Sequence, residues 1–291
     1  MIQRKVETIG IHPSHQGFLG QGHLATAVID GSNFEETDPF ILLMDDNLDL
    51  PGGPPVGGPH PHAGFETVTL VLQGNDTNFK TGSLEVMTAG RGIVHTEEIT
   101  AKTKLRILQL WLVLPPEKRW AEPFFQQILL GAVPTLKTAN REVRVYSGSS
   151  QGLTSPLQNN APFTLVDFSL EKGVEITQEL PASYNGFIYL IEGAVIIDET
   201  KIEKGQSGWL DRPDQAGNSF ITFKAGDQGA RFVLYAGKPQ KASIVSHGPF
   251  IGDTQDDIVR LYQEYRQGKM PHLNNLAESS KIKYGNKDRP S

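Results

Sequence analysis

Residues 60–74 read His-Pro-His-Ala-Gly-Phe-Glu-Thr-Val-Thr-Leu-Val-Leu-Gln-Gly and join a histidine pair to a β-strand. The run 67–72 consists of β-branched and aliphatic side chains, which favour extended structure, and a turn-forming Gly-Asn-Asp triplet follows it. Side chains alternate between the two faces of a strand, so His60, His62 and Glu66 are expected on one face. The pattern therefore predicts two imidazoles and a carboxylate on the same side of a strand.

A second segment, residues 87–97, reads Met-Thr-Ala-Gly-Arg-Gly-Ile-Val-His-Thr-Glu and repeats this pattern. The alternation again places His95 and Glu97 on one face. Gly90 and Gly92 lie just ahead of the histidine, where a backbone bend can aim the imidazole inward. Three imidazoles and a carboxylate from two facing strands can form one metal site.

Composition limits the metals that this site can hold. The chain has eight histidines and no cysteine, so a metal must be bound through nitrogen and oxygen atoms. That ligand set favours Fe(II), Mn, Ni, Cu or Zn. A lone histidine is more often structural than a ligand, which is how we interpret the five outside the cluster, at positions 12, 15, 23, 247 and 272.

Charge and hydropathy argue against two classes of partner. The net charge is −6 and lysines and arginines do not form runs, so direct binding to nucleic acid or to an anionic membrane is not expected. The sequence has no apolar run of about 18 residues and no apolar signal core at its start. We therefore expect a cytoplasmic protein.

The fold class follows from 30 glycines and 19 prolines that separate many short apolar runs. This organisation predicts an all-β protein, a sandwich or barrel. The expected strands are 24–29, 40–44, 66–72, 83–87, 105–114, 143–146, 164–170, 187–192, 194–198, 208–210 and 230–236. A helix is expected at 254–268, where Thr254 can cap the first turn, and we expect it to pack on the second barrel.

A partial internal repeat predicts two similar domains. Residues 65–74 resemble residues 186–193, because both are apolar strands that end in a polar residue and a glycine. The segment before the second copy, residues 180–185, offers no imidazole or carboxylate, so one metal per chain is expected. We predict an N-terminal metal-binding domain at 1–146, a linker at 147–156, and a C-terminal domain without metal ligands at 157–291.

Three segments, 60–69, 87–97 and 108–115, together resemble the pirin family of bicupins. The resemblance implies two cupin domains, which are jelly-roll-like β-barrels, and a C-terminal helix. It also implies a mononuclear iron in the N-terminal barrel, with His60, His62, His95 and Glu97 as ligands. In the broader cupin pattern the carboxylate ligand is Glu66, which is otherwise a partner that orients a ligand imidazole.

The resemblance implies an oxygenase that opens the flavonol ring of quercetin, or of a related small aromatic compound, with O₂. Glu97 is then also the catalytic base that accepts the substrate's hydroxyl proton, and Val68, Leu70 and Phe40 line the pocket. The alternative is an iron-binding regulatory protein that acts through contact with a protein partner. The hairpin between residues 74 and 82 is shorter than is usual in the family, which bears on substrate preference rather than metal binding.

Overall fold

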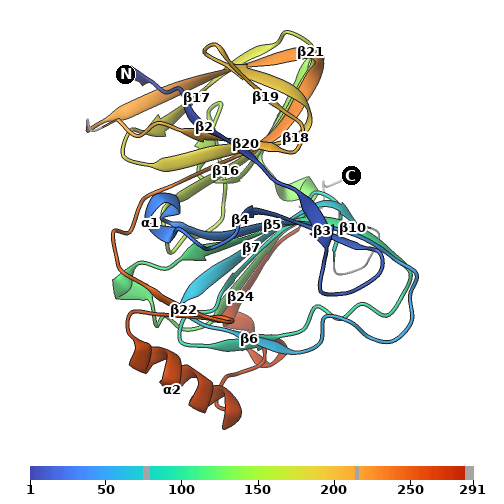
Figure 1. Cartoon of the computed structure of the whole chain (residues 1–291), viewed down its shortest axis with the longest axis vertical. Helices are drawn as coiled ribbons and strands as arrows, with labels where there is room; N and C mark the ends of the chain where they lie inside the picture. Colours follow the sequence, from blue (N-terminus) through green and yellow to red (C-terminus); the bar gives the residue numbers. More distant parts are fainter. Residues whose placement is uncertain (75–78, 214–215, 286–291) are drawn as a thin grey trace, which may run out of the picture. The chain divides into compact units, whose positions relative to one another are not determined.

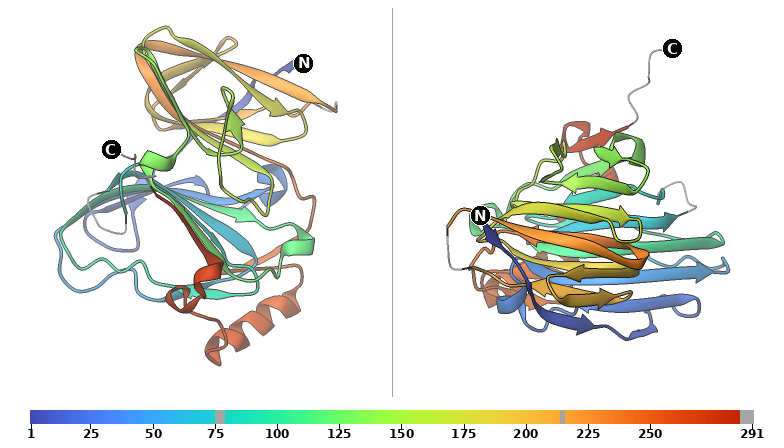
Figure 2. Two further views of the ribbon diagram at one scale, coloured as in Figure 1. Left: turned by 180° about the vertical axis from the view of Figure 1, so that it is seen from behind. Right: turned by 90° about the horizontal axis from the view of Figure 1, so that it is seen from above.

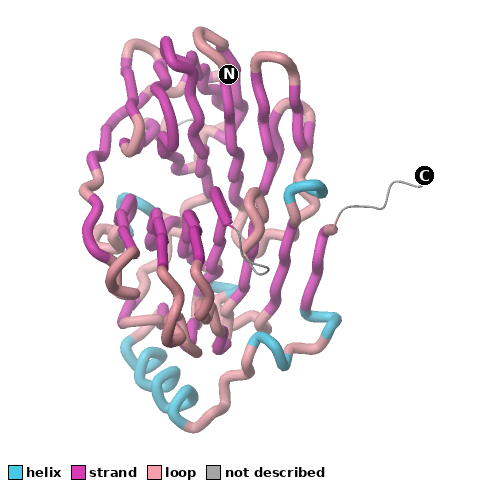
Figure 3. Tube along the Cα trace, turned by 90° about the vertical axis from the view of Figure 1, so that its right-hand side faces the viewer, coloured by secondary structure: helices cyan, strands magenta, loops and turns pink. Residues whose placement is uncertain are grey.

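The structure is a computed structural model, and it describes residues 1–74, 79–213 and 216–285. Strands dominate it, and helices are few and mostly short (Figure 3), which confirms the all-β prediction. The helical elements are α1 (Phe34–Thr37), α2 (Gln255–Arg266) and the 3₁₀ turns Pro116–Lys118, Leu130–Ala132, Leu273–Asn275 and Glu278–Ser280. No helix in the described ranges is long and apolar enough to cross a membrane. The turn predicted after residue 74 lies outside the described residues.

The chain forms two compact units, each of which collects segments that are distant in sequence. The first unit contains Ser14–Glu36, Phe40–Ala132 and the chain from Gln240 onward. The second unit contains Met1–Pro13, Thr37–Pro39 and Val133–Pro239.

An eight-stranded sheet forms most of the first unit, in the order β24-β11-β8-β7-β10-β5-β4-β3 (Figure 1). Its strands are β3 (Ser14–Gln16), β4 (His23–Ile29), β5 (Phe40–Leu50), β7 (Phe65–Gly74), β8 (Leu84–Thr88), β10 (Thr103–Val113), β11 (Phe124–Ile128) and β24 (Lys281–Tyr284). Two small sheets accompany it, β6 (His60–His62) with β9 (Ile93–His95), and β22 (Val245–His247) with β23 (Phe250–Gly252).

A ten-stranded sheet forms most of the second unit, with β12-β13-β16-β21-β18-β20-β2 as its main path. β1 and β17 pair with β21, and β19 pairs with β18. Its strands are β1 (Ile2–Gln3), β2 (Val6–Ile11), β12 (Thr135–Lys137), β13 (Arg141–Ser147), β16 (Phe163–Leu170), β17 (Glu175–Pro181), β18 (Asn185–Ile197), β19 (Thr200–Glu203), β20 (Gln206–Leu210) and β21 (Asn218–Gly237).

The two units differ from the predicted domains 1–146 and 157–291 at both ends of the chain. The N-terminal strands pair with the second unit, β2 with β20 and β1 with β21. The C-terminal strand β24 pairs with β11 of the first unit (Figure 2). The predicted linker 147–156 instead carries a small hairpin, β14 (Ser149–Ser150) with β15 (Leu153–Thr154). Local apolar patterns locate strands, but strand pairing decides which unit an end joins.

Helix α2 forms where the sequence predicts it but packs elsewhere. Thr254 caps it, because its hydroxyl accepts a hydrogen bond from the backbone N–H of Asp257, and the Asp257 side chain accepts one from the Thr254 backbone in return. Its buried residues Ile258 and Leu261 cluster with Ala63 and Phe250 of the first unit. The expectation that this helix packs on the second barrel is therefore wrong.

Candidate metal centre

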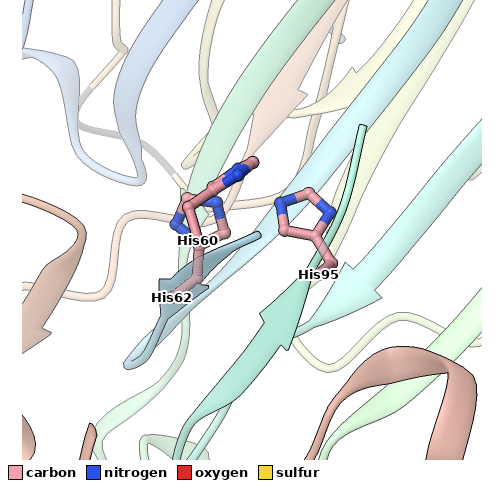
Figure 4. A group of neighbouring side chains, drawn as sticks. All are labelled: His60, His62 and His95. Carbon is pink, nitrogen blue, oxygen red and sulfur yellow. The ribbon is translucent and has the colours of Figure 1, made fainter. Parts of the chain in front are cut away.

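Three of the predicted ligands meet in the first unit. β6 and β9 pair antiparallel so that His60 lies directly opposite His95, and His62 follows on the same strand as His60. The three rings turn toward one another (Figure 4), and one ring nitrogen from each lies within 4.8 Å of the others. The predicted histidine cluster is therefore present as a group that can hold a metal ion.

Two glycines shape the approach to His95, as expected from the sequence. Gly90 and Gly92 have φ angles of 51° and 132°, in the region where side chains with a Cβ are strained. A Cβ on Gly90 also collides with the carbonyl of Ala121. The bend between β8 and β9 thus depends on these glycines.

The hydrogen bonding of the imidazoles fits a metal. His60 Nδ1 lies 2.8 Å from the Gly58 carbonyl, to which it donates, so its Nε2 keeps a free lone pair. Within the described part of the chain, His62 Nδ1 and His95 Nε2 are buried and have no hydrogen-bond partner. Leaving a buried ring nitrogen unpaired costs about 1–3 kcal/mol, a cost that a metal–nitrogen bond removes. Ring nitrogens that are not used in hydrogen bonds are the donor atoms that a metal centre requires.

Burial also keeps the imidazoles in the form that binds metal. Desolvation, and then the neighbouring His60, lower the pKa of His62 to about 3, while the carbonyl of Pro249 acts in the opposite direction. Desolvation, followed by the charges of His62, His60 and His272, lowers the pKa of His95 to about 2. Both rings are therefore neutral at physiological pH, with lone pairs available.

The two candidate carboxylates lie in different places. Glu97 lines the same cavity as His60 and His62, and its Oε1 accepts a hydrogen bond of 3.4 Å from Gln109 Nε2. Burial, and then the charge of Asp46, raise the pKa of Glu97 to about 7, against the effect of Gln109. No carboxylate of the described residues joins the 4.8 Å group, so Glu97 as fourth ligand stays a prediction.

Glu66 is held away from the histidine group. It is 1% exposed, and Thr88 Oγ1 donates a 2.7 Å hydrogen bond to its Oε1. Gly64, with φ of 88°, separates β6 from β7, so the alternation that starts at His60 does not continue into β7. On β7 the residues that border a cavity are Thr67 and Thr69, one position out of phase with Glu66.

A cavity of about 970 Å³ opens beside the histidines. Its wall is largely apolar and comes mainly from Phe18, Leu19, Leu42, Met44, Leu48, Val56, Phe79, Ile99, Leu105, Ile107 and Trp111. The expected lining residues Val68, Leu70 and Phe40 are not among them, because they are buried at 1%, 1% and 0% exposure within the core. Trp111 contributes instead, with the centre of its ring 5.3 Å from that of His62.

A second, more polar cavity of about 490 Å³ reaches His95 and Glu97 from another side. It follows a row of inward side chains on neighbouring strands, since Thr69 pairs with Glu85 and Glu85 pairs with Gln127. Gln127 Nε2 donates a 2.7 Å hydrogen bond to Glu85. Burial is the main reason that the pKa of Glu85 rises to about 7.

The larger cavity contains one pair of side chains that was not predicted from the sequence. His23, which we interpreted as structural, lies there with its Nε2 at 2.8 Å from Asp46 Oδ1. Burial raises the pKa of Asp46, while the hydrogen bond from His23 lowers it. The signal was available, because Asp46 follows Leu42 and Met44 at every second position of an otherwise apolar strand face.

Two domain models match the chain. One described as Pirin covers residues 23–112, and one described as Pirin C-terminal cupin domain covers residues 165–271. Pirin-like protein 2 of Arabidopsis thaliana is 34% identical over 265 residues, which cover 86% of this chain and 81% of that protein.

Solved structures of two proteins have a fold similar to that of this chain. A crystal structure from Geobacillus kaustophilus has a TM-score of 0.75 and 32% identity, and the match covers 83% of this chain and 99% of that one. A quercetin 2,3-dioxygenase from Acinetobacter baumannii has a TM-score of 0.76 and 25% identity, with 92% and 98% covered. The fold and the histidine group thus define a protein of two cupin-type domains. The chain belongs to the pirin family, as the sequence motifs predict.

Proposed function

We propose that this protein is a metal-dependent dioxygenase that opens the ring of a flavonol such as quercetin, or of a related aromatic compound. The observation that carries the proposal is the convergence of three imidazoles, two of them with orphaned buried nitrogens, beside a large apolar cavity. The similarity to the quercetin 2,3-dioxygenase of Acinetobacter baumannii supports the substrate class.

The ligands that we propose are His60, His62, His95 and Glu97, with Fe(II) as the metal. Such an ion would supply Lewis acidity toward a substrate oxygen and would react with O₂. The substrate supplies the electrons and O₂ supplies both oxygen atoms, so the reaction requires no separate reductant.

The chain's own groups have distinct tasks in this proposal. Glu97 lines the cavity that the substrate enters, so its carboxylate can accept the proton of the substrate's hydroxyl. Gln109 holds that carboxylate by its hydrogen bond to Oε1. The apolar wall, with Trp111 beside His62, binds a flat ring system and displaces water.

Oxygen uptake with quercetin tests the proposal. Protein reconstituted with Fe(II) should consume O₂ in proportion to quercetin, whereas the metal-free protein and a His62→Ala variant should not. The control is His247→Ala, because His247 lies outside the histidine group and contacts Tyr262. Stoichiometric iron without uptake for any flavonol contradicts the enzyme and favours the alternative, an iron-binding regulatory protein that acts on a protein partner.

A further inference from the structure

Besides Glu97, a second acidic side chain of the described residues, Asp46, interrupts the apolar wall of the large cavity. The inward face of β5 carries Leu42, Met44, Asp46 and Leu48, and all four border the cavity. Its neighbour Asp45 points to the other face, where Arg106 binds both of its oxygens at 2.9 and 2.7 Å. A carboxylate in an apolar wall is costly unless something donates hydrogen bonds to it.

His23 holds one oxygen of this carboxylate in a fixed place. The backbone N–H of Leu19 donates to His23 Nδ1 at 3.3 Å, so Nδ1 is an acceptor and Nε2 carries the proton. Nε2 then donates to Asp46 Oδ1 at 2.8 Å. His23 is 2% exposed, so the pair is anchored in the protein and not in solvent.

The other oxygen of Asp46 is available to a ligand. Among the described residues, the hydrogen bond from His23 is the one that Asp46 accepts from a side chain, and it involves Oδ1. A carboxylate with a purely structural role in a buried pair usually has both oxygens satisfied by the protein. Asp46 instead leaves Oδ2 as an acceptor on the cavity side.

The strand pairing places Asp46 near the part of the cavity that contains Glu97. Asp46 pairs with Ile107 on β10, and Gln109, two residues farther along β10, binds Glu97. Diagonal neighbours on adjacent strands lie about 7–8 Å apart. A fused or linked ring system that contacts the histidines with one oxygen can therefore bring a second hydroxyl to Asp46.

We propose that Asp46 is a specificity-determining residue that accepts a hydrogen bond from a phenolic hydroxyl of the substrate, remote from the oxygen at the metal. His23 is its positioning residue. The inference rests on the proposed function, because it places an aromatic substrate in this cavity. It adds a preference for polyhydroxylated rings over rings whose only hydroxyl faces the metal.

The test compares quercetin with 3-hydroxyflavone, which keeps the metal-facing hydroxyl and lacks the others. Dissociation constants are measured by quenching of tryptophan fluorescence, since Trp111 lines the cavity, with and without Fe(II). Asp46→Asn should weaken quercetin binding about 10-fold or more and 3-hydroxyflavone binding less than about 2-fold. The matched control is Asp49→Asn, because Asp49 is on the same strand with its side chain 63% exposed.

His23→Asn should weaken quercetin binding by a smaller factor than Asp46→Asn does and should change 3-hydroxyflavone binding less than about 2-fold, since His23 acts through Asp46. Circular dichroism and the amount of bound iron serve as the folding controls for each variant. Equal losses for both flavonols in Asp46→Asn overturn the role of Asp46 while leaving the dioxygenase proposal intact. If wild-type protein binds neither flavonol, the substrate class itself is wrong.

Discussion

The interiors of the two units are built from similar strands and filled in opposite ways. The second unit is closed by aromatic packing, with Phe168 stacked on Phe232 at 5.0 Å and Phe223 at 4.7 Å from Phe232. These rings belong to a cluster in which every member is almost fully buried. The first unit instead encloses cavities of about 970 and 490 Å³ beside its histidines. Similar strands thus enclose a packed core or surround cavities, depending on the side chains that point inward.

The internal repeat shows which residues cause the difference between the two interiors. When 65–74 and 186–193 are aligned at their final glycines, Thr69 corresponds to Ile188. Thr69 borders the polar cavity, whereas Ile188 is fully buried in the core of the second unit. A polar side chain at an inward position prevents dry packing, and an aliphatic one promotes it.

The largest expected effect is on the metal itself. His62→Ala removes a proposed ligand and should weaken metal binding by more than about 100-fold, while the metal-free protein keeps its fold. Metal content of the purified protein, measured by elemental analysis, is the readout. His12→Ala, in the second unit, should keep the wild-type content, since His12 binds Ser207 there. Full metal occupancy in the His62 variant contradicts the proposed ligand set.

The second-largest expected effect is on the free energy of unfolding, and it compares the interiors of the two units directly. Phe168→Ala leaves a cavity among packed rings and should lower the free energy of unfolding by about 3–5 kcal/mol. Met44→Ala, whose side chain already borders a cavity, should cost only about 1 kcal/mol, because fewer packed contacts are lost. Denaturant titration of both metal-free variants measures the difference. Equal losses of unfolding free energy in the two variants imply that the interior of the first unit is as tightly packed in solution as that of the second.

Sequence alternation predicted the strands and the histidine cluster well, because both depend on local backbone geometry. The run 67–72 and the pair His60 and His62 needed no distant information. Alternation did not place Glu66 correctly, because the bend at Gly64 changes which face of the strand the following residues occupy. It also did not identify the pocket lining, because Val68 and Leu70 are buried in the core. The unit to which each chain end belongs also depends on long-range pairing, as between β24 and β11, which no local pattern encodes.

The polar interior should also make stability depend on pH. Burial raises the pKa of Glu85 to about 7, above its value in an unfolded chain. From pH 4.5 to 7 the folded state therefore holds more protons than the unfolded state, so stability falls as pH rises and levels off above pH 7.

Glu85→Gln removes this contribution and should stabilise the metal-free protein at pH 8 by on the order of 2 kcal/mol relative to its effect at pH 4.5. The other groups that influence Glu85 are Gln127, Glu97 and Lys283, and Glu97 retains its own dependence in the variant. Unfolding by urea across this pH range is the measurement. An unchanged slope in the variant shows that water, rather than protein, surrounds Glu85.

The smallest expected effect is the loss of unfolding free energy when the N-cap of helix α2 is removed. It shows which of the two units this helix stabilises. Thr254→Ala removes the hydroxyl that caps α2 and should cost about 1 kcal/mol, while Thr254→Ser keeps the cap. Because Ile258 and Leu261 pack with Ala63, which follows the proposed ligand His62, this loss should appear in the unfolding of the first unit. Added metal identifies that unit in calorimetry, since binding to the folded state raises its transition temperature. A shift of the metal-insensitive transition instead means that the helix stabilises the packed unit, as its place in the sequence first suggests.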